Sequence, residues 1–403
     1  MLCINLVKAK RILSLLLLSV FVVGTVVLGR PAPAAAITPN CGSTAFLIDT
    51  TLPNGARWVM CWEERRNEGI VLHEAYFTPR NGVQRLVLYR ASVSQIHVPY
   101  DNNGARLHDV SDYGLGGANL LDLTPAECPG GALLQNNGKD VICRTVSGDG
   151  YAYKAYGTQK QAYALSLFSV SGIGKYNYIP KWKFFDDGTI EPSMGAAGTL
   201  QFCTTDSRYG WHINAPGCVR GTSHTHNYFR RLDFDMGGEA NDEFQQIDFG
   251  GVGTSYRPIT YGNTRTETAR VVSQTGFRTW RILDRYVRNA DGHPISYELD
   301  AESSHTFRGP AYEPWTRNDV YFTENRLVVN DTYCEQFVSH NPTRTGCAGN
   351  LASFVNGQSV TDGVLWYGMS FHHLARDEDH PRMSTHWSSF QLIPRDVTAN
   401  SIR

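Results

Sequence analysis

The chain has 403 residues, of which 41% are hydrophobic, so it is long enough and apolar enough to bury a large core. Its 37 basic and 38 acidic residues give a formal net charge of −1. Without an excess of positive charge the chain lacks the electrostatic footprint of a nucleic-acid-binding protein, so nucleic acid is excluded as a partner.

Residues 1–36 are typical of a secretory signal peptide. A basic start is followed by an apolar run from Ile12 to Gly29 and by small residues up to Ala36. The alternative is a retained membrane anchor, because the run approaches the ~20 residues that span a bilayer. The alanines after Pro33 favour cleavage near Ala36. We therefore expect the mature protein to be secreted, extracellular or periplasmic, with no membrane contact after cleavage.

Residues 37–403 are expected to form one domain, since no repeat, low-complexity linker or long polar tract divides them. Segments rich in β-branched and aromatic residues run from Arg85 to Val98, Ala162 to Phe185 and Arg270 to Leu283. Turn pairs such as Asn81-Gly82 separate them, and no long segment has helical periodicity. The sequence predicts an all-β fold, a large antiparallel β-sandwich.

Eight cysteines remain once Cys3 has left with the signal peptide. An even number in an exported chain indicates disulfides, and zinc ligation is disfavoured because no couple has Cys-x-x-Cys spacing. Eight cysteines allow about 105 pairings, so connectivity stays open. The simplest arrangement joins sequence neighbours: Cys41 with Cys61, Cys128 with Cys143, Cys203 with Cys218, and Cys334 with Cys347.

A His-x-His pair, His224 and His226, is a candidate metal-binding motif. On a strand both rings point to the same face and can reach one ion, and imidazole suits copper, zinc, iron or nickel. The alternative is the polar face of an exposed strand.

Taken in order, many short segments resemble the catalytic domain of the copper amine oxidases. They span most of the mature chain, beginning with Gly69-Ile70-Val71-Leu72-His73-Glu74, Leu88-Tyr89-Arg90-Ala91-Ser92 and Val98-Pro99-Tyr100. They continue with Asp109 to Gly116, Gly174 to Tyr178, Asp187 to Ile190, the His-x-His stretch, and Trp366 to His373. The resemblance implies a catalytic-domain-only member, without the two smaller domains that precede this domain in many relatives, and a homodimer.

The resemblance implies three copper ligands, because His373 joins His224 and His226 from a distant strand. Three neutral imidazoles suit Cu(II). His372 is the rival for the third place, since a slip of one residue in strand register would turn its ring toward the metal instead.

Tyr176 aligns with the tyrosine that the family oxidises to its topaquinone cofactor. The family pattern is Asn-Tyr-Asp/Glu-Tyr, whereas this chain has Lys175-Tyr176-Asn177-Tyr178. The change puts an amine beside the expected quinone. The alternative role of Tyr176 is an aromatic packing residue on a strand.

Asp109 aligns with the family's catalytic base, which takes a proton from the substrate carbon that bears the amine. Here its motif reads Asp109-Val110-Ser111-Asp112-Tyr113. The alternative is that Asp109 caps a turn before Tyr113. Tyr100 aligns with a tyrosine that hydrogen-bonds the quinone oxygen.

A peripheral calcium site of the family falls on the side chains of Asp233, Asp235 and Asp362 and on the backbone carbonyls of Phe234 and Gly363. Carboxylate and carbonyl oxygens are what a hard cation needs. Surface aspartates beside turns are the alternative. The Cys128–Cys143 couple falls on a disulfide of the family.

The leading hypothesis is a secreted primary-amine oxidase that uses copper, topaquinone, a small primary amine and dioxygen. A second is a copper-binding protein on the same scaffold that makes no quinone. A third is an oxidase with a different tyrosine-derived cofactor or an unusual substrate. The sequence does not identify the amine.

Overall fold

The computed structural model describes residues 37–301, 307–325 and 349–402. Most of the described backbone is in strands, every ladder between these strands is antiparallel, and the helices are single turns. The predicted all-β, antiparallel sandwich with little helix is confirmed.

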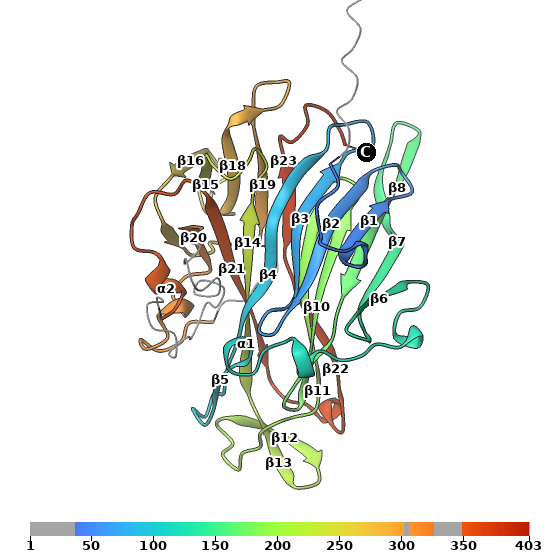
Figure 1. Cartoon of the computed structure of the whole chain (residues 1–403). Helices are drawn as coiled ribbons and strands as arrows, with labels where there is room; N and C mark the ends of the chain where they lie inside the picture. Colours follow the sequence, from blue (N-terminus) through green and yellow to red (C-terminus); the bar gives the residue numbers. More distant parts are fainter. Residues whose placement is uncertain (1–36, 302–306, 326–348, 403) are drawn as a thin grey trace, which may run out of the picture. The chain divides into compact units, whose positions relative to one another are not determined.

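The first sheet carries the His-x-His strand at its centre (Figure 1). Within the described residues its order is β1 (Leu47–Thr51), β2 (Arg57–Arg65), β3 (Gly69–Thr78), β4 (Arg85–Pro99), β14 (His224–Phe234), β21 (Gly363–His373), β20 (Val320–Glu324) and β17 (Thr268–Arg270), with β5 (Arg106–His108) beside β4.

The second sheet carries Tyr176. Its order in the described part of the chain is β16 (Ile259–Thr264), β15 (Asp242–Phe249), β18 (Thr279–Arg288), β19 (Pro294–Asp300), β23 (Gln391–Arg395), β11 (Ile190–Gly198), β10 (Tyr176–Phe185), β8 (Thr158–Phe168), β7 (Lys139–Ala155) and β6 (Ala132–Asn136), with β22 (Met383–Ser389) beside β11 and β9 (Ser171–Ile173) beside β10.

Short elements complete the described chain. A hairpin of β12 (Gly210–Ala215) and β13 (Cys218–Thr222) leads directly into β14. The helices are α1 (Asp109–Asp112) and α2 (Leu351–Phe354), and 3-10 turns lie at Thr44–Phe46, Gly117–Asn119, Pro125–Glu127, Pro314–Thr316 and Asp377–Asp379.

The two sheets pack face to face through alternate residues of their strands. Trp58 of β2 packs against Phe184 of β10 with ring centroids 4.9 Å apart, and its indole N–H donates to the Phe185 carbonyl at 2.8 Å. Arg230 of β14 is also fully buried and donates to the Ser193 carbonyl of β11 at 2.6 Å. Burial of such large side chains is the main favourable term for this fold.

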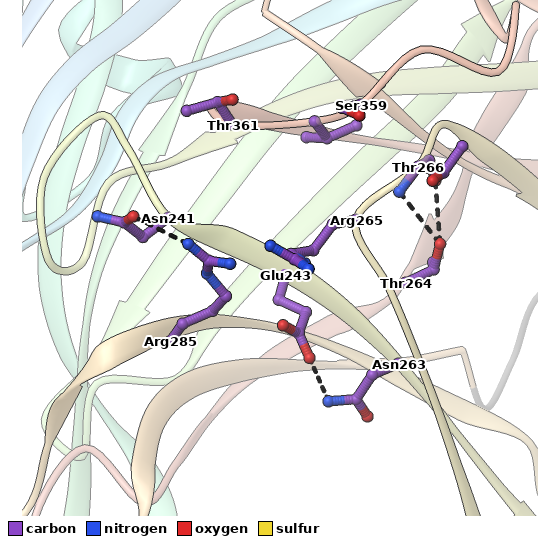
Figure 2. Close-up of a pocket in the computed structure, with 10 residues that line it drawn as sticks. Asn241, Glu243, Asn263, Thr264, Arg265, Thr266, Arg285, Ser359 and Thr361 are labelled. Carbon is purple, nitrogen blue, oxygen red and sulfur yellow. Dashed lines mark hydrogen bonds between the residues drawn. The ribbon is translucent and has the colours of Figure 1, made fainter.

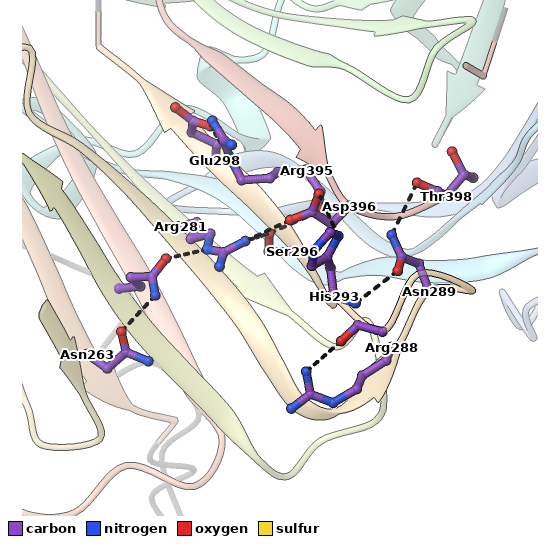
Figure 3. Close-up of polar contacts among 12 residues, drawn as sticks. Asn263, Arg281, Arg288, Asn289, His293, Ser296, Glu298, Arg395, Asp396 and Thr398 are labelled. Atoms are coloured by element: carbon purple, nitrogen blue, oxygen red, sulfur yellow. Dashed lines mark hydrogen bonds and ion pairs between the residues drawn. The ribbon is translucent and has the colours of Figure 1, made fainter. Parts of the chain in front are cut away.

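The C-terminal strand is tied to its sheet by a polar network (Figure 3). The Arg281 guanidinium of β18 donates to Ser296 Oγ at 3.2 Å and to Asp396 Oδ2 at 3.1 Å. Glu298 and Arg395, from the paired strands β19 and β23, form an ion pair alongside. These contacts hold β23 between β19 and β11, where it completes the sheet that carries Tyr176.

Three of the predicted disulfides are confirmed: Cys41–Cys61, Cys128–Cys143 and Cys203–Cys218. Cys334, Cys347 and the signal segment 1–36 lie outside the described residues. The described chain from Ile37 onward belongs to one compact unit, while the domain boundary at residue 36 stays a prediction. None of the helices seen in residues 37–301, 307–325 and 349–402 is long and apolar enough to cross a membrane.

Candidate metal centre and active site

Two neighbouring strands of the first sheet bring the three histidines together. β14 and β21 pair with His224 directly opposite His373. His226, two residues along β14, shares the inward face because side chains alternate along a strand. All three are buried, and one ring nitrogen from each lies within 4.8 Å of the others.

Hydrogen bonds leave each histidine one nitrogen for a metal. His224 Nδ1 donates to the Thr222 carbonyl at 3.0 Å, and His373 Nε2 donates to Asp379 Oδ2 at 3.0 Å. His226 Nδ1 lies 3.3 Å from the Tyr178 hydroxyl. The remaining nitrogens are Nε2 of His224, Nε2 of His226 and Nδ1 of His373, with the first two 3.1 Å apart. Ring nitrogens fixed in this way are typical of metal-ligating histidines.

Burial also keeps the imidazoles in the form that binds metal. It lowers the pKa of His224 to about 3, with a further contribution from His373, and holds the pKa of His226 well below its ordinary value. Neutral imidazole is the ligand that Cu(II) takes, so the residues present fit a copper ion.

Tyr176 reaches the histidines from the opposite sheet. It is the first residue of β10, is buried, and its hydroxyl lies 2.9 Å from His224 Nε2, one of the nitrogens left for a metal. Tyr100 packs face to face with His224 from the end of β4, at 4.5 Å between ring centroids. The flanking residues Lys175 and Asn177 are exposed. The structure therefore does not bear out the expectation of an amine beside Tyr176, because alternation turns these side chains to the other face.

Asp109 begins α1 and points into the sandwich. Its backbone carbonyl accepts the N–H of Tyr113 that closes the turn, whereas its carboxylate accepts a hydrogen bond from the Tyr178 hydroxyl at 2.7 Å. Gln95 fixes α1 by accepting from the Val110 N–H and donating to Ser111 Oγ, both at 3.0 Å. The carboxylate thus faces the tyrosines and does not cap the turn.

The burial of Asp109 perturbs its acidity. Loss of water raises the pKa of Asp109 to about 7, against the opposing hydrogen bond from Tyr178. Its second oxygen, Oδ1, is buried without a hydrogen-bond partner in the described part of the chain. A carboxylate with one oxygen held and one free, and a pKa near neutral, is suited to proton transfer.

A cavity of about 290 Å³ opens against this cluster. Tyr176, His226 and His373 line its inner end, together with Met383, whose sulfur lies 3.9 Å from the Tyr176 hydroxyl. His372 lines the same cavity but is exposed and bonds Asp101 Oδ2 at 2.8 Å. The ring that faces the other two histidines is therefore that of His373.

A second group of ligand atoms lies at the other end of β14 and β21. Oxygens of Asp233, Asp235 and Asp362 lie within 4.8 Å of one another, and in the described residues each carboxylate keeps a buried Oδ1 without a partner. Burial and neighbouring carboxylates raise the pKa of Asp235 to about 8 and that of Asp362 to about 7. Three partly unpaired carboxylates fit a hard cation such as calcium.

Another cavity, of about 630 Å³, lies elsewhere in the molecule (Figure 2). It is polar and lies beside the start of β21, where Thr361, Asn241 and Arg285 line it. His373 is at the other end of that strand, about 33 Å away at ~3.3 Å per residue. This cavity does not belong to the histidine cluster.

Two residues of the cluster were given no role by sequence reasoning. Tyr178 bonds both Asp109 and His226, and Asp379 fixes the tautomer of His373. The position of Tyr178, two residues beyond Tyr176 on one strand, is a signal that could have identified it. Glu378-Asp379 is one of the segments that resemble the family, but strand periodicity gives Asp379 no role because it lies on a turn after β21.

The fold and the site define a β-sandwich protein with a candidate metal centre, in which three buried histidines lie beside a tyrosine. The family described as copper amine oxidase, enzyme domain, matches residues 149–401, more than half of the chain. The chain belongs to the copper amine oxidase family.

Individual curated proteins that are similar to this chain are also amine oxidases. The chain is 26% identical over 369 residues to the primary amine oxidase of Klebsiella aerogenes, covering 78% of this chain and 48% of that protein. It is 26% identical over 396 residues to the histamine oxidase of Arthrobacter globiformis, covering 87% and 56%. This chain thus spans about half the length of the curated relatives it matches.

Solved structures share the fold. The lysyl oxidase of Pichia pastoris is similar with a TM-score of 0.69 at 22% identity, over 86% of this chain and 52% of that one. The amine oxidase of Aspergillus nidulans is similar with a TM-score of 0.70 at 19% identity, over 93% and 55%.

Proposed function

We propose that this chain is a copper-dependent primary-amine oxidase. The overall reaction, R–CH2–NH2 + O2 + H2O → R–CHO + NH3 + H2O2, removes two electrons from the amine and reduces dioxygen to hydrogen peroxide. The observation that carries the proposal is the Tyr176 hydroxyl, 2.9 Å from His224 Nε2 within a cluster of three buried histidines.

In this proposal His224, His226 and His373 hold copper, and Tyr176 is the precursor of topaquinone. Copper and quinone together supply the two-electron chemistry that side chains alone lack. Tyr100, which packs on His224, would donate a hydrogen bond to the cofactor oxygen.

Asp109 is the base that takes the proton from the substrate carbon next to nitrogen. Its free oxygen, Oδ1, accepts that proton while Oδ2 stays bonded to Tyr178. Because burial raises the pKa of Asp109 to about 7, the carboxylate can accept a proton and release it again near neutral pH.

The rival function is a copper-binding protein that makes no quinone, and a third is an oxidase with a different tyrosine-derived cofactor. The exposure of Lys175 and Asn177 argues against both, because these departures from the family pattern do not touch the cluster.

The test is peroxide and aldehyde release by the copper-loaded protein with a panel of primary amines, with secondary amines of the same carbon skeleton as controls. Equal amounts of aldehyde and peroxide from primary amines are expected. Full copper without either product would overturn the proposal.

We also propose that Asp233, Asp235 and Asp362, with the carbonyls of Phe234 and Gly363, hold a structural calcium ion. The three unpartnered buried Oδ1 atoms in the described residues support it, since a cation would satisfy all of them at once.

Secretion and a homodimer complete the proposal. Three disulfides suit an oxidising compartment. Exposed aromatic side chains on two hairpins, Tyr151 and Tyr156 on β7–β8 and Trp211 on β12–β13, offer surface for a second copy. A particle mass twice that of the chain in solution is the expected result.

A further inference from the structure

We propose that Tyr178 is a positioning residue whose hydroxyl joins the base Asp109 to the copper ligand His226. This inference rests on the proposed function and adds a residue to it. Tyr178 is fully buried, and its oxygen lies 2.7 Å from Asp109 Oδ2 and 3.3 Å from His226 Nδ1.

The strand explains why this tyrosine is in place. Side chains two apart share a face, so Tyr178 follows Tyr176 into the sandwich, and the two rings lie nearly parallel with centroids 6.3 Å apart. His224 and His226 repeat the same spacing on β14 of the facing sheet. Tyr176 therefore meets His224 while Tyr178 meets His226, as two parallel contacts across the sandwich.

The donor and acceptor count sets the direction of the hydrogen bonds. If His226 Nε2 holds a copper ion, the single proton of that neutral ring is on Nδ1 and is donated to the Tyr178 oxygen. Tyr178 has one hydroxyl proton, and it donates this proton in a hydrogen bond to Asp109 Oδ2. The chain from His226 through Tyr178 to Asp109 thus needs an acceptor oxygen at Asp109 Oδ2, which the carboxylate supplies.

Two consequences follow from this direction. The Tyr178 oxygen orients the His226 ring for the metal, as outer partners of ligating histidines do. The Tyr178 proton fixes Oδ2 of Asp109 and leaves Oδ1 for the substrate proton. The Tyr178 hydroxyl therefore orients both the His226 ring, a proposed copper ligand, and the Asp109 carboxylate, the proposed base.

The test compares Tyr178→Phe with Tyr228→Phe. Tyr228 is equally buried and stacks beside His226, but its hydroxyl has no hydrogen-bond partner among the residues that the structure describes. Copper affinity is measured by competition with a chelator of known affinity. We expect Tyr178→Phe to bind copper about 10- to 100-fold more weakly than wild type, the usual cost of losing an outer hydrogen bond, and Tyr228→Phe to match wild type.

The pH profile of turnover gives a second readout. Loss of the Tyr178 hydrogen bond raises the pKa of Asp109, so the acid limb of Tyr178→Phe moves to higher pH, whereas that of Tyr228→Phe does not. If the two variants share copper affinity and pH profile, the inference is wrong. A wild-type protein that binds no copper would instead overturn the proposed function.

A second pair of variants keeps the inference testable if Tyr178→Phe does not fold. Asp109→Asn retains an oxygen that can accept from Tyr178, whereas Asp109→Leu does not and leaves the hydroxyl proton to compete for His226 Nδ1. Copper affinity should fall about tenfold in Asp109→Leu and stay unchanged in Asp109→Asn. Equal affinity in both would contradict the bridge.

Discussion

At the scale of single residues, the charge of Asp109 governs the expected pH dependence. Burial raises its pKa to about 7, so the base form prevails above that pH and is lost below it. We predict that kcat/KM of the wild-type enzyme falls about tenfold per pH unit below pH ~7. Asp109→Asn should keep copper yet lose a factor of about 10² to 10⁴ in turnover, the usual worth of a positioned base.

Asp112 is the control because it lies on the same turn but is exposed, outside the buried cluster. Its charge contributes to the raised pKa of Asp109, so Asp112→Asn should keep turnover and move the acid limb slightly to lower pH. Turnover of Asp109→Asn at the wild-type level would remove Asp109 from the mechanism.

The adjacent histidines of β21 give a second residue-scale prediction. His373 faces the other two imidazoles, whereas His372 faces outward and bonds Asp101. Elemental analysis should find that His373→Ala loses most of its copper and that His372→Ala retains one copper per chain. The reverse result would mean that the register of β21 differs by one residue.

At the scale of elements, β14 and β21 carry a candidate metal site at each end. The predicted calcium ion joins Asp233 and Asp235 of the β14 end to Asp362 just before β21, so its removal should loosen this part of the sandwich. Calcium at one hundred times its dissociation constant stabilises a folded state by about 2.7 kcal/mol. We predict that calcium raises the melting temperature of wild-type protein over a chelator control.

Asp235→Asn should abolish that increment, and Glu239→Gln should preserve it, because Glu239 is exposed and outside the cluster. A calcium response that persists in Asp235→Asn would show that the ion binds elsewhere.

Two disulfides provide a matched pair of elements. Cys128–Cys143 and Cys203–Cys218 both close 15-residue separations. If each acts by restricting the unfolded chain, replacing either pair with serines should lower the free energy of unfolding by about 3 kcal/mol. Denaturant titration under non-reducing conditions measures the loss. Clearly unequal losses would indicate that native contacts of the two loops, and not chain entropy, set their value.

At the scale of the whole molecule, the sequence predicted the features that depend on local residue patterns or on the order of family motifs. Alternation and turn signals predicted the antiparallel sandwich, and neighbouring cysteines predicted four disulfides, of which the three in the described residues are confirmed. The position of His373 opposite His224 required the family pattern, since strand pairing between distant segments leaves no local signal.

The contacts between the two sheets could not be predicted from the sequence. The bridge from Asp109 through Tyr178 to His226 joins a turn and two strands of facing sheets. The same limit applies to Lys175. The sequence placed its amine next to Tyr176 in the chain, and only the structure shows that its side chain is exposed. Periodicity shows which side chains share a face, but not which face of another sheet they meet.

The most direct test of the account is the visible spectrum of protein that has been purified without copper, loaded aerobically with Cu(II), and then treated with phenylhydrazine. The account predicts a visible band that grows after copper addition in wild-type protein and shifts with about one equivalent of phenylhydrazine per chain. Tyr176→Phe should bind copper and stay colourless. Wild-type protein that holds one copper through its three histidines yet remains colourless and unreactive would contradict the account, and the copper-binding function would replace the oxidase.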